Sequence, residues 1–219
     1  MSERFAAERR AMVAGQLRGR GIEDERVLEA MARVPREAFL DEPGRERAYD
    51  DAPVAIGFGQ TMSQPYMVAL IAQAAGVGPG RRILDVGTGS GYAAAVFAEL
   101  GLEVHTIERI PELAERAGAR LRETGYDDVR VHVGDGSLGV PEAAPFNAVA
   151  VAAAAPRLPL ALYDQLVLGG RLVVPVGGRH AQRLEVAVRS PEGPAVLHSV
   201  PCRFVPLVGE RGHRWSNRG

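Results

Sequence analysis

Apolar runs alternate with segments of helical spacing through the middle of the chain. Short runs rich in branched aliphatic residues predict strands, and apolar positions recurring every three to four residues predict the helices between them. A chain that alternates strand and helix in this way predicts a parallel sheet with helices on both faces. The expected strands are 82–86, 103–107, 129–133, 146–151 and 171–176, and the expected helices are 92–100, 111–124 and 158–166.

The part of the chain before the first strand has a different pattern. Apolar positions at helical spacing over 5–33 are interrupted by Gly19 and Gly21, so we expect two short helices, the second over 24–33. Residues 37–61 contain many turn formers and little periodicity, which predicts an irregular segment crossing an edge of the sheet. Another helix is expected from Ser63 to about residue 75.

Alternating apolar positions appear after the fifth strand. They cover Leu184, Val186 and Val188 and then 196–205, which predicts antiparallel strands that complete the far edge of the sheet. The expected fold is therefore α/β, with a doubly wound, mostly parallel sheet, antiparallel C-terminal strands and an N-terminal helical extension. The length of 219 residues suits one domain, in which 1–78 forms a helical cap on the substrate side, 79–208 the cofactor-binding sheet and 209–219 a frayed tail.

A glycine-rich turn follows the first expected strand. Gly87, Gly89 and Gly91 can adopt backbone angles that side chains forbid, and their missing Cβ atoms let a ligand approach the main chain. A cofactor site is the first hypothesis, and a strand-to-helix turn without a ligand is the alternative. Thr88 and Ser90 lie between the glycines and belong to the same candidate site.

Acidic residues stand at the carboxyl ends of the next two strands. Glu108 lies 21 residues after Gly87, a spacing at which an acidic residue accepts hydrogen bonds from ribose hydroxyls. Asp135 lies between Gly134 and Gly136, where an ordinary turn explains it equally well. Because open α/β sheets bind ligands at the carboxyl ends of their strands, we expect these residues to share one site.

Composition excludes several classes of function. The 26 basic residues balance 27 acidic ones, whereas a nucleic-acid-binding protein would carry a basic surplus. No run reaches membrane-spanning length, the amino terminus is charged, and a single cysteine, Cys202, suits a reducing compartment. We expect a cytoplasmic monomer without a membrane or nucleic-acid partner. The five histidines show no ligand-like spacing, so no metal site is expected.

The spacing of the glycine turn distinguishes between two cofactors. An NAD-binding turn would read Gly-x-Gly-x-x-Gly, whereas this chain has Gly-x-Gly-x-Gly after Asp85. Together with Asp135, this version of the turn is similar to that of Rossmann-like methyltransferases. The chain resembles the protein-L-isoaspartate O-methyltransferase family over roughly residues 10–208, and Thr-Met-Ser-Gln-Pro-Tyr at 61–66 is the stretch that distinguishes that family from other methyltransferases. The stretches that carry the resemblance are 34–39, 48–49, 59–67, 85–92, 133–136, 165–166 and 204–207.

The resemblance implies a cofactor and a reaction. A methyl group would pass from S-adenosylmethionine to the carboxylate of an isoaspartyl residue in a damaged protein or peptide, and the ester would then collapse to a succinimide that can reopen to aspartate. A carboxylate with a pKa near 4 is ionised at neutral pH, so no general base is required. The protein would place the carboxylate and the methyl group in line and exclude water, a task for which segment 37–61 and the N-terminal helices are suited.

The resemblance also implies residues on the substrate side. Ser63 would orient the acceptor carboxylate, although a serine two residues before Pro65 is also a typical helix N-cap. Thr61, Gln64 and Pro65 are further candidates on the same turn. Tyr66 is a candidate wall of the peptide groove, with a place in the hydrophobic core as the alternative.

On the cofactor side, the turn 87–91 would hold the amino-acid end of S-adenosylmethionine. Glu108 would hold the ribose hydroxyls, and Asp135 with Gly136 would face the adenine. Asp85 would organise the turn near the amino group of the methyl donor.

Two residues depart from the family pattern. The family commonly carries glutamate where Asp85 stands, which shortens the reach of the carboxylate, and aspartate where Asn147 stands, at the amino end of the fourth strand. Three other functions stay open. They are a methyltransferase acting on a normal aspartate of a dedicated peptide, an inactive cofactor-binding module, and a nicotinamide-dependent oxidoreductase, which the glycine spacing disfavours.

Overall fold

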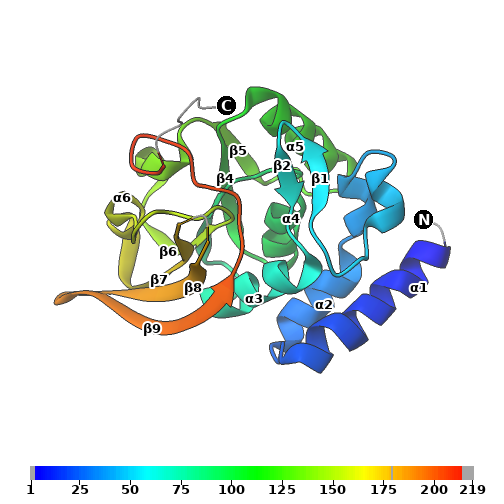
Figure 1. Cartoon of the computed structure of the whole chain (residues 1–219), viewed down its shortest axis with the longest axis horizontal. Helices are drawn as coiled ribbons and strands as arrows, with labels where there is room; N and C mark the ends of the chain where they lie inside the picture. Colours follow the sequence, from blue (N-terminus) through cyan, green and yellow to red (C-terminus); the bar gives the residue numbers. More distant parts are fainter. Residues whose placement is uncertain (1–2, 179, 214–219) are drawn as a thin grey trace.

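A seven-stranded sheet forms the centre of the computed structural model, which describes residues 3–178 and 180–213 (Figure 1). The strand order is β5-β4-β3-β6-β7-β8-β9, with parallel pairing from β5 through β7 and antiparallel pairing between β7, β8 and β9. This arrangement confirms the predicted fold class. The strands are β3 Arg82–Val86, β4 Glu103–Glu108, β5 Arg130–Val133, β6 Phe146–Val151, β7 Leu166–Gly177, β8 Gln182–Ser190 and β9 Gly193–Cys202.

Hydrophobic clusters cover both faces of this sheet. Alternate residues of β3 point to opposite sides, so Ile83 packs in one cluster with α2 to α5, whereas Leu84 packs in the other with α6. Both faces of the inner parallel strands are therefore buried, as is typical of doubly wound sheets. The helices are α1 Glu3–Ala11, α2 Glu25–Arg33, α3 Pro65–Ala75, α4 Tyr92–Glu99, α5 Pro111–Glu123 and α6 Leu160–Tyr163.

The helix predicted over 158–166 is wrong in its extent. Helix α6 covers only Leu160–Tyr163, and Leu166 already belongs to β7, where it pairs with Phe146. The side chain of Gln165 accepts a hydrogen bond from the Val140 amide at 2.9 Å and donates to the Leu138 carbonyl at 2.7 Å. Tertiary pairing therefore ends the helix early.

The irregular segment predicted over 37–61 contains regular structure. Two 3₁₀ helices, Arg36–Phe39 and Gly44–Arg47, precede a β-hairpin of β1 Val54–Gly57 and β2 Gln60–Met62. Phe58 has a φ of 54° in the hairpin turn, a value rare for a residue with a side chain. The hairpin crosses in front of α4, next to the glycine-rich turn (Figure 1).

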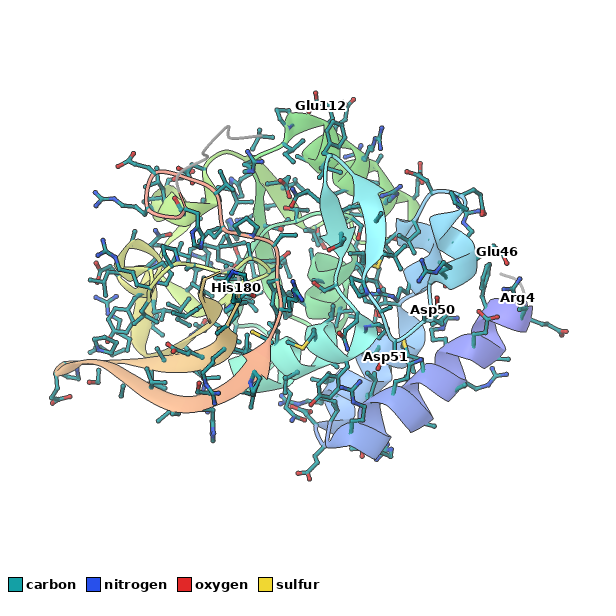
Figure 2. All side chains as sticks on the ribbon, viewed as in Figure 1. Arg4, Glu46, Asp50, Asp51, Glu112 and His180 are labelled. Atoms are coloured by element: carbon teal, nitrogen blue, oxygen red, sulfur yellow. The ribbon has the colours of Figure 1, made fainter. Side chains whose placement is uncertain are left out.

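The N-terminal extension packs beside this hairpin segment. Helix α1 continues through a π-helical turn, Met12–Leu17, and a 3₁₀ turn, Arg18–Arg20, before Gly21 ends the helical path. Buried Met12 and Leu17 anchor it to the core. Exposed ion pairs of Arg4 with Glu46 (Figure 2) and of Arg20 with Asp51 also connect the two segments, but exposed pairs contribute little to stability.

The C-terminal segment returns over the carboxyl edge of the sheet. The Ala154 amide donates to the Val205 carbonyl, and the Leu207 amide donates to the Ala154 carbonyl, each at 2.8 Å. Residues 209–213, the start of the predicted tail, lie against the turn after β5, where the Glu210 amide donates to Asp135 at 2.7 Å. Residues 214–219 of that tail lie outside the described residues.

Over 3–178 and 180–213, no helix combines the length and apolarity that a bilayer crossing requires.

Candidate active site

The candidate site lies where the strand order reverses. From β3 the chain continues to β4 and β5 on one side, and then crosses to β6 on the other side. The helices that follow β3 and β6 therefore diverge and leave a crevice at the carboxyl ends of these strands, the usual ligand site of open α/β sheets. Ala152, which follows β6, lines this crevice.

The glycine-rich turn forms the floor of the crevice. Gly87, Gly89 and Gly91 have φ angles of 99°, 55° and 93°, which favour glycine at all three positions. A Cβ atom on Gly89 would lie 3.3 Å from Cδ1 of Ile56 in the hairpin. The predicted turn is present, and its backbone lies directly against the hairpin.

Glu108 braces this turn from the end of β4. Its Oε2 accepts a hydrogen bond from the Gly89 amide at 3.0 Å, and its Oε1 accepts one from the Ile110 amide at 3.1 Å. The side chain is buried but still lines the crevice. It brings a carboxyl group to the rim where a ribose was expected.

Asp85 is buried beneath the same turn. Its Oδ2 accepts a hydrogen bond of 2.8 Å from Thr106 Oγ1, which shares a second one of 2.7 Å with Thr88 Oγ1. Burial, with a smaller contribution from the charge of Glu108, raises the pKa of the Asp85 carboxyl to about 7. The hydroxyl of Ser90 instead accepts from the Tyr92 amide at 3.4 Å, at the start of α4.

Three adjoining cavities make up the crevice, and Thr61 and Ala152 line all of them. The first, of about 510 Å³, lies between the glycine turn and Ser63. The second, of about 570 Å³, is bordered by Glu108 and Gly136, and the third, of about 690 Å³, opens beside Gln64. Their shared lining residues, Thr61 and Ala152, join the three cavities into one crevice.

Ser63 faces the first and third cavities. The N-cap of α3 is Gln64, with Pro65 at the first helical position, so the interpretation of Ser63 as the N-cap is wrong. Gln64 lines the third cavity, and its Nε2 donates to Asp51 at 3.2 Å. The structure thus joins Thr61, Ser63 and Gln64 at one wall of the crevice.

Four predicted site residues lie outside these cavity walls: Pro65, Tyr66, Gly91 and Asp135. The ring of Tyr66 lies 3.9 Å from the Arg20 guanidinium carbon and packs against the hydrophobic core. The Asp135 carboxylate accepts hydrogen bonds from the Ser137 amide and hydroxyl and from the Glu210 amide. Partial burial acts in the opposite direction, but these hydrogen bonds hold the pKa of the Asp135 carboxyl below its usual range. Gly136 does line the second cavity.

Asn147 has a structural contact at the opposite edge of the sheet. Its Oδ1 accepts a hydrogen bond from the Arg82 amide at 3.0 Å, at the amino end of β3. This departure from the family pattern therefore lies away from the crevice.

Within the described ranges, no group of three His, Cys, Asp or Glu side chains is placed to hold a metal ion.

Several crevice residues were not assigned to the site from the sequence. Ala152 directly follows β6, and Val205 and Leu207 come from the C-terminal segment. Ile56 of the hairpin lies against the glycine turn beside them. The alternation of buried Val54 and Ile56 before Gly57-Phe58-Gly59 is a signal that could have identified the hairpin. The other residues reach the crevice only through long-range pairing.

Comparison with known proteins decides the family. The sequence profile of the family described as "Protein-L-isoaspartate(D-aspartate) O-methyltransferase" matches residues 7–212, nearly the whole chain. The chain belongs to this family. The resemblance inferred from the motifs is thereby confirmed, and it extends over both the glycine turn and the stretch around Ser63.

Individual relatives of this family are similar over their full lengths. The chain is 56% identical over 206 residues to protein-L-isoaspartate O-methyltransferase 2 of Marinobacter nauticus, covering 93% of this chain and 94% of that protein. It is 51% identical over 201 residues to the Gloeobacter violaceus protein-L-isoaspartate O-methyltransferase, covering 91% and 98%. A crystal structure of the putative enzyme from Plasmodium falciparum, in complex with S-adenosyl-L-homocysteine, matches with a TM-score of 0.78 at 26% identity over 91% and 98% of the two chains.

Proposed function

We propose that this family member transfers a methyl group from S-adenosylmethionine to the carboxylate of L-isoaspartyl residues in damaged proteins and peptides, which starts their repair through a succinimide. The observation that carries the proposal is that Ser63 and the glycine turn line the same cavity. The acceptor side and the donor side of the reaction are therefore adjacent.

We further propose that the protein is a monomer in the cytoplasm. A reducing compartment suits a sequence whose only cysteine is Cys202.

The residues of the crevice fit the cofactor. The buried carboxyl of Asp85 accepts a hydrogen bond from Thr106, and burial raises its pKa. A cation placed beside this carboxyl would favour its ionised form. The ammonium of S-adenosylmethionine is such a cation. Gly87 and Gly89 expose main chain to the amino-acid end of the cofactor, and Glu108 offers carboxylate oxygens to the ribose hydroxyls.

The chain supports the transfer by placement. The cofactor supplies an electrophilic methyl group on a sulfonium, and the acceptor carboxylate is already ionised at neutral pH. The Ser63 hydroxyl donates a hydrogen bond to one carboxylate oxygen and leaves the other free to attack. The hairpin over the glycine turn keeps water from the two opposite charges that cancel as the bond forms.

A paired-peptide assay tests this function. Two peptides that differ only in aspartate or isoaspartate are incubated with the protein and methyl-labelled S-adenosylmethionine, and the base-labile label is measured. We expect labelling of the isoaspartyl peptide and only background on its partner. Equal labelling of both peptides would contradict repair specificity, labelling of the aspartyl peptide alone would favour a dedicated aspartate methyltransferase, and no labelling of either would favour an inactive binding module.

A further inference from the structure

Arg36 is the largest fully buried side chain among the described residues and lies behind Ser63. Its Nε donates to the Ala48 carbonyl at 2.6 Å, and its Nη2 donates to the Ser63 carbonyl at 2.7 Å. The guanidinium carbon lies 4.8 Å from the centre of the Tyr92 ring, within the range of a cation–π contact. Arg36 therefore touches the segment that carries Ser63 and the first residue of α4.

The surroundings of Arg36 are not those of a stabilising ion pair. The groups that face its charge are two carbonyls and an aromatic ring, and Nη1 has no hydrogen-bond partner among the described residues. The adjacent buried Glu37 instead accepts a hydrogen bond from the Tyr49 hydroxyl. A buried charge is costly, and an apolar side chain of similar volume would fill the same space without that cost. The position therefore requires the donors of a guanidinium for a reason other than packing.

The geometry of the contacts indicates that reason. Ala48 and Ser63 bracket the chain segment that contains the hairpin, and both carbonyls bind to one planar group. Tyr92 directly follows the glycine turn and lines the first cavity. Arg36 thus joins the acceptor wall to the donor wall of the crevice. Lysine, a point charge without a planar fork, could not hold both carbonyls in the same geometry.

We propose that Arg36 is a positioning residue for methyl transfer, which fixes the backbone of Ser63 so that its hydroxyl points to the acceptor carboxylate. This inference rests on the proposed function. A displacement of about 1 Å at a reacting centre can lower a rate about 100-fold, so a rigid support behind Ser63 would act mainly on kcat.

A double-mutant cycle separates positioning from general stabilisation. Arg36→Lys, Ser63→Ala and the double variant are assayed with the isoaspartyl peptide, and S-adenosylhomocysteine binding is measured for each. We expect Arg36→Lys to lower kcat about tenfold or more in the wild-type background but about twofold or less in Ser63→Ala, because coupled residues are not additive. Cofactor affinity should stay within about twofold in every variant.

Arg171→Lys is the matched control, because Arg171 also donates to a main-chain carbonyl, that of Ala74 at the far end of α3. It should keep the wild-type kcat. If Arg36→Lys does not fold, Arg36→Gln, which retains one donor, replaces it in the cycle.

Three results would overturn the inference: an unchanged kcat in the Arg36 variant, an equal loss in both backgrounds, or a parallel loss of cofactor binding. Failure of the proposed function itself would be distinguishable, because the wild-type protein would then not discriminate isoaspartyl from aspartyl peptides.

Discussion

Replacing Glu108 with alanine is expected to weaken S-adenosylhomocysteine binding about 100-fold. Hydrogen bonds to a charged group contribute about 1.5–3 kcal/mol each, and about 1.4 kcal/mol corresponds to a tenfold change in affinity. The variant loses the proposed acceptor for the ribose hydroxyls and also the hydrogen bond from the Gly89 amide, which lies 3.0 Å from Oε2. Isothermal titration calorimetry with S-adenosylhomocysteine measures the change.

Glu103→Ala is the matched control for this prediction. Glu103 lies at the amino end of the same strand, β4, where it pairs with Arg82 and Arg130 at 3.3 and 3.1 Å. Its removal should leave the affinity within about twofold of wild type, since distant sites act independently. A Glu108→Ala variant that binds as tightly as Glu103→Ala would remove Glu108 from the cofactor site.

The affinity for S-adenosylhomocysteine is expected to fall up to tenfold for each pH unit below about 7. Burial raises the pKa of the Asp85 carboxyl to about 7 in the free protein, so Asp85 is mostly neutral below that pH. The cofactor ammonium favours the ionised form, and binding at low pH must therefore release a proton. Titrations from about pH 5.5 to about pH 8.5, which extend roughly 1.5 units to each side of this pKa, measure the slope. Repeating them in buffers of different ionisation enthalpy measures the proton release.

Asp85→Asn should remove this pH dependence and weaken binding at pH 8. The same substitution should stabilise the free protein at pH 8. The sign follows from linkage: a carboxyl whose folded pKa is raised stabilises the fold at pH values below its unfolded pKa of about 3.9, and that stability is lost as the pH rises through about 7. Thermal unfolding with and without S-adenosylhomocysteine separates the two effects. An unchanged slope in the variant would assign the pH dependence to another group.

The central strands could be predicted from the sequence because their signals are local and strong. The apolar runs at Arg82–Val86 and Phe146–Val151 match β3 and β6 to the residue. Residues 158–166 carry a helical pattern, but pairing of Leu166 with Phe146 is a long-range interaction that local spacing does not contain. The hairpin was missed although Val54 and Ile56 supply a local signal, because its turn places Phe58 at a positive φ against the ordinary preference of that residue.

The candidate site was also predictable only in part, and the predictable part again depends on local signals. The glycine turn and Glu108 belong to one βαβ unit with a characteristic spacing, and the structure brings them together as expected. Asp135 is held by the Glu210 amide, which is 75 positions away in the chain, and no local pattern indicates that contact. Arg36 was noted only as part of the 34–39 stretch, and its role could not be predicted, because its carbonyl partners lie 12 and 27 positions away in the chain.

The most direct measurement is a crystal structure of the protein with S-adenosylhomocysteine and an isoaspartyl peptide. We predict that the cofactor sulfur lies between the glycine turn and Ser63, with the ribose hydroxyls on Glu108. The Ser63 hydroxyl should donate a hydrogen bond to the isoaspartyl carboxylate. A cofactor bound elsewhere, or a Ser63 hydroxyl turned away from the peptide into apolar side chains, would contradict the account.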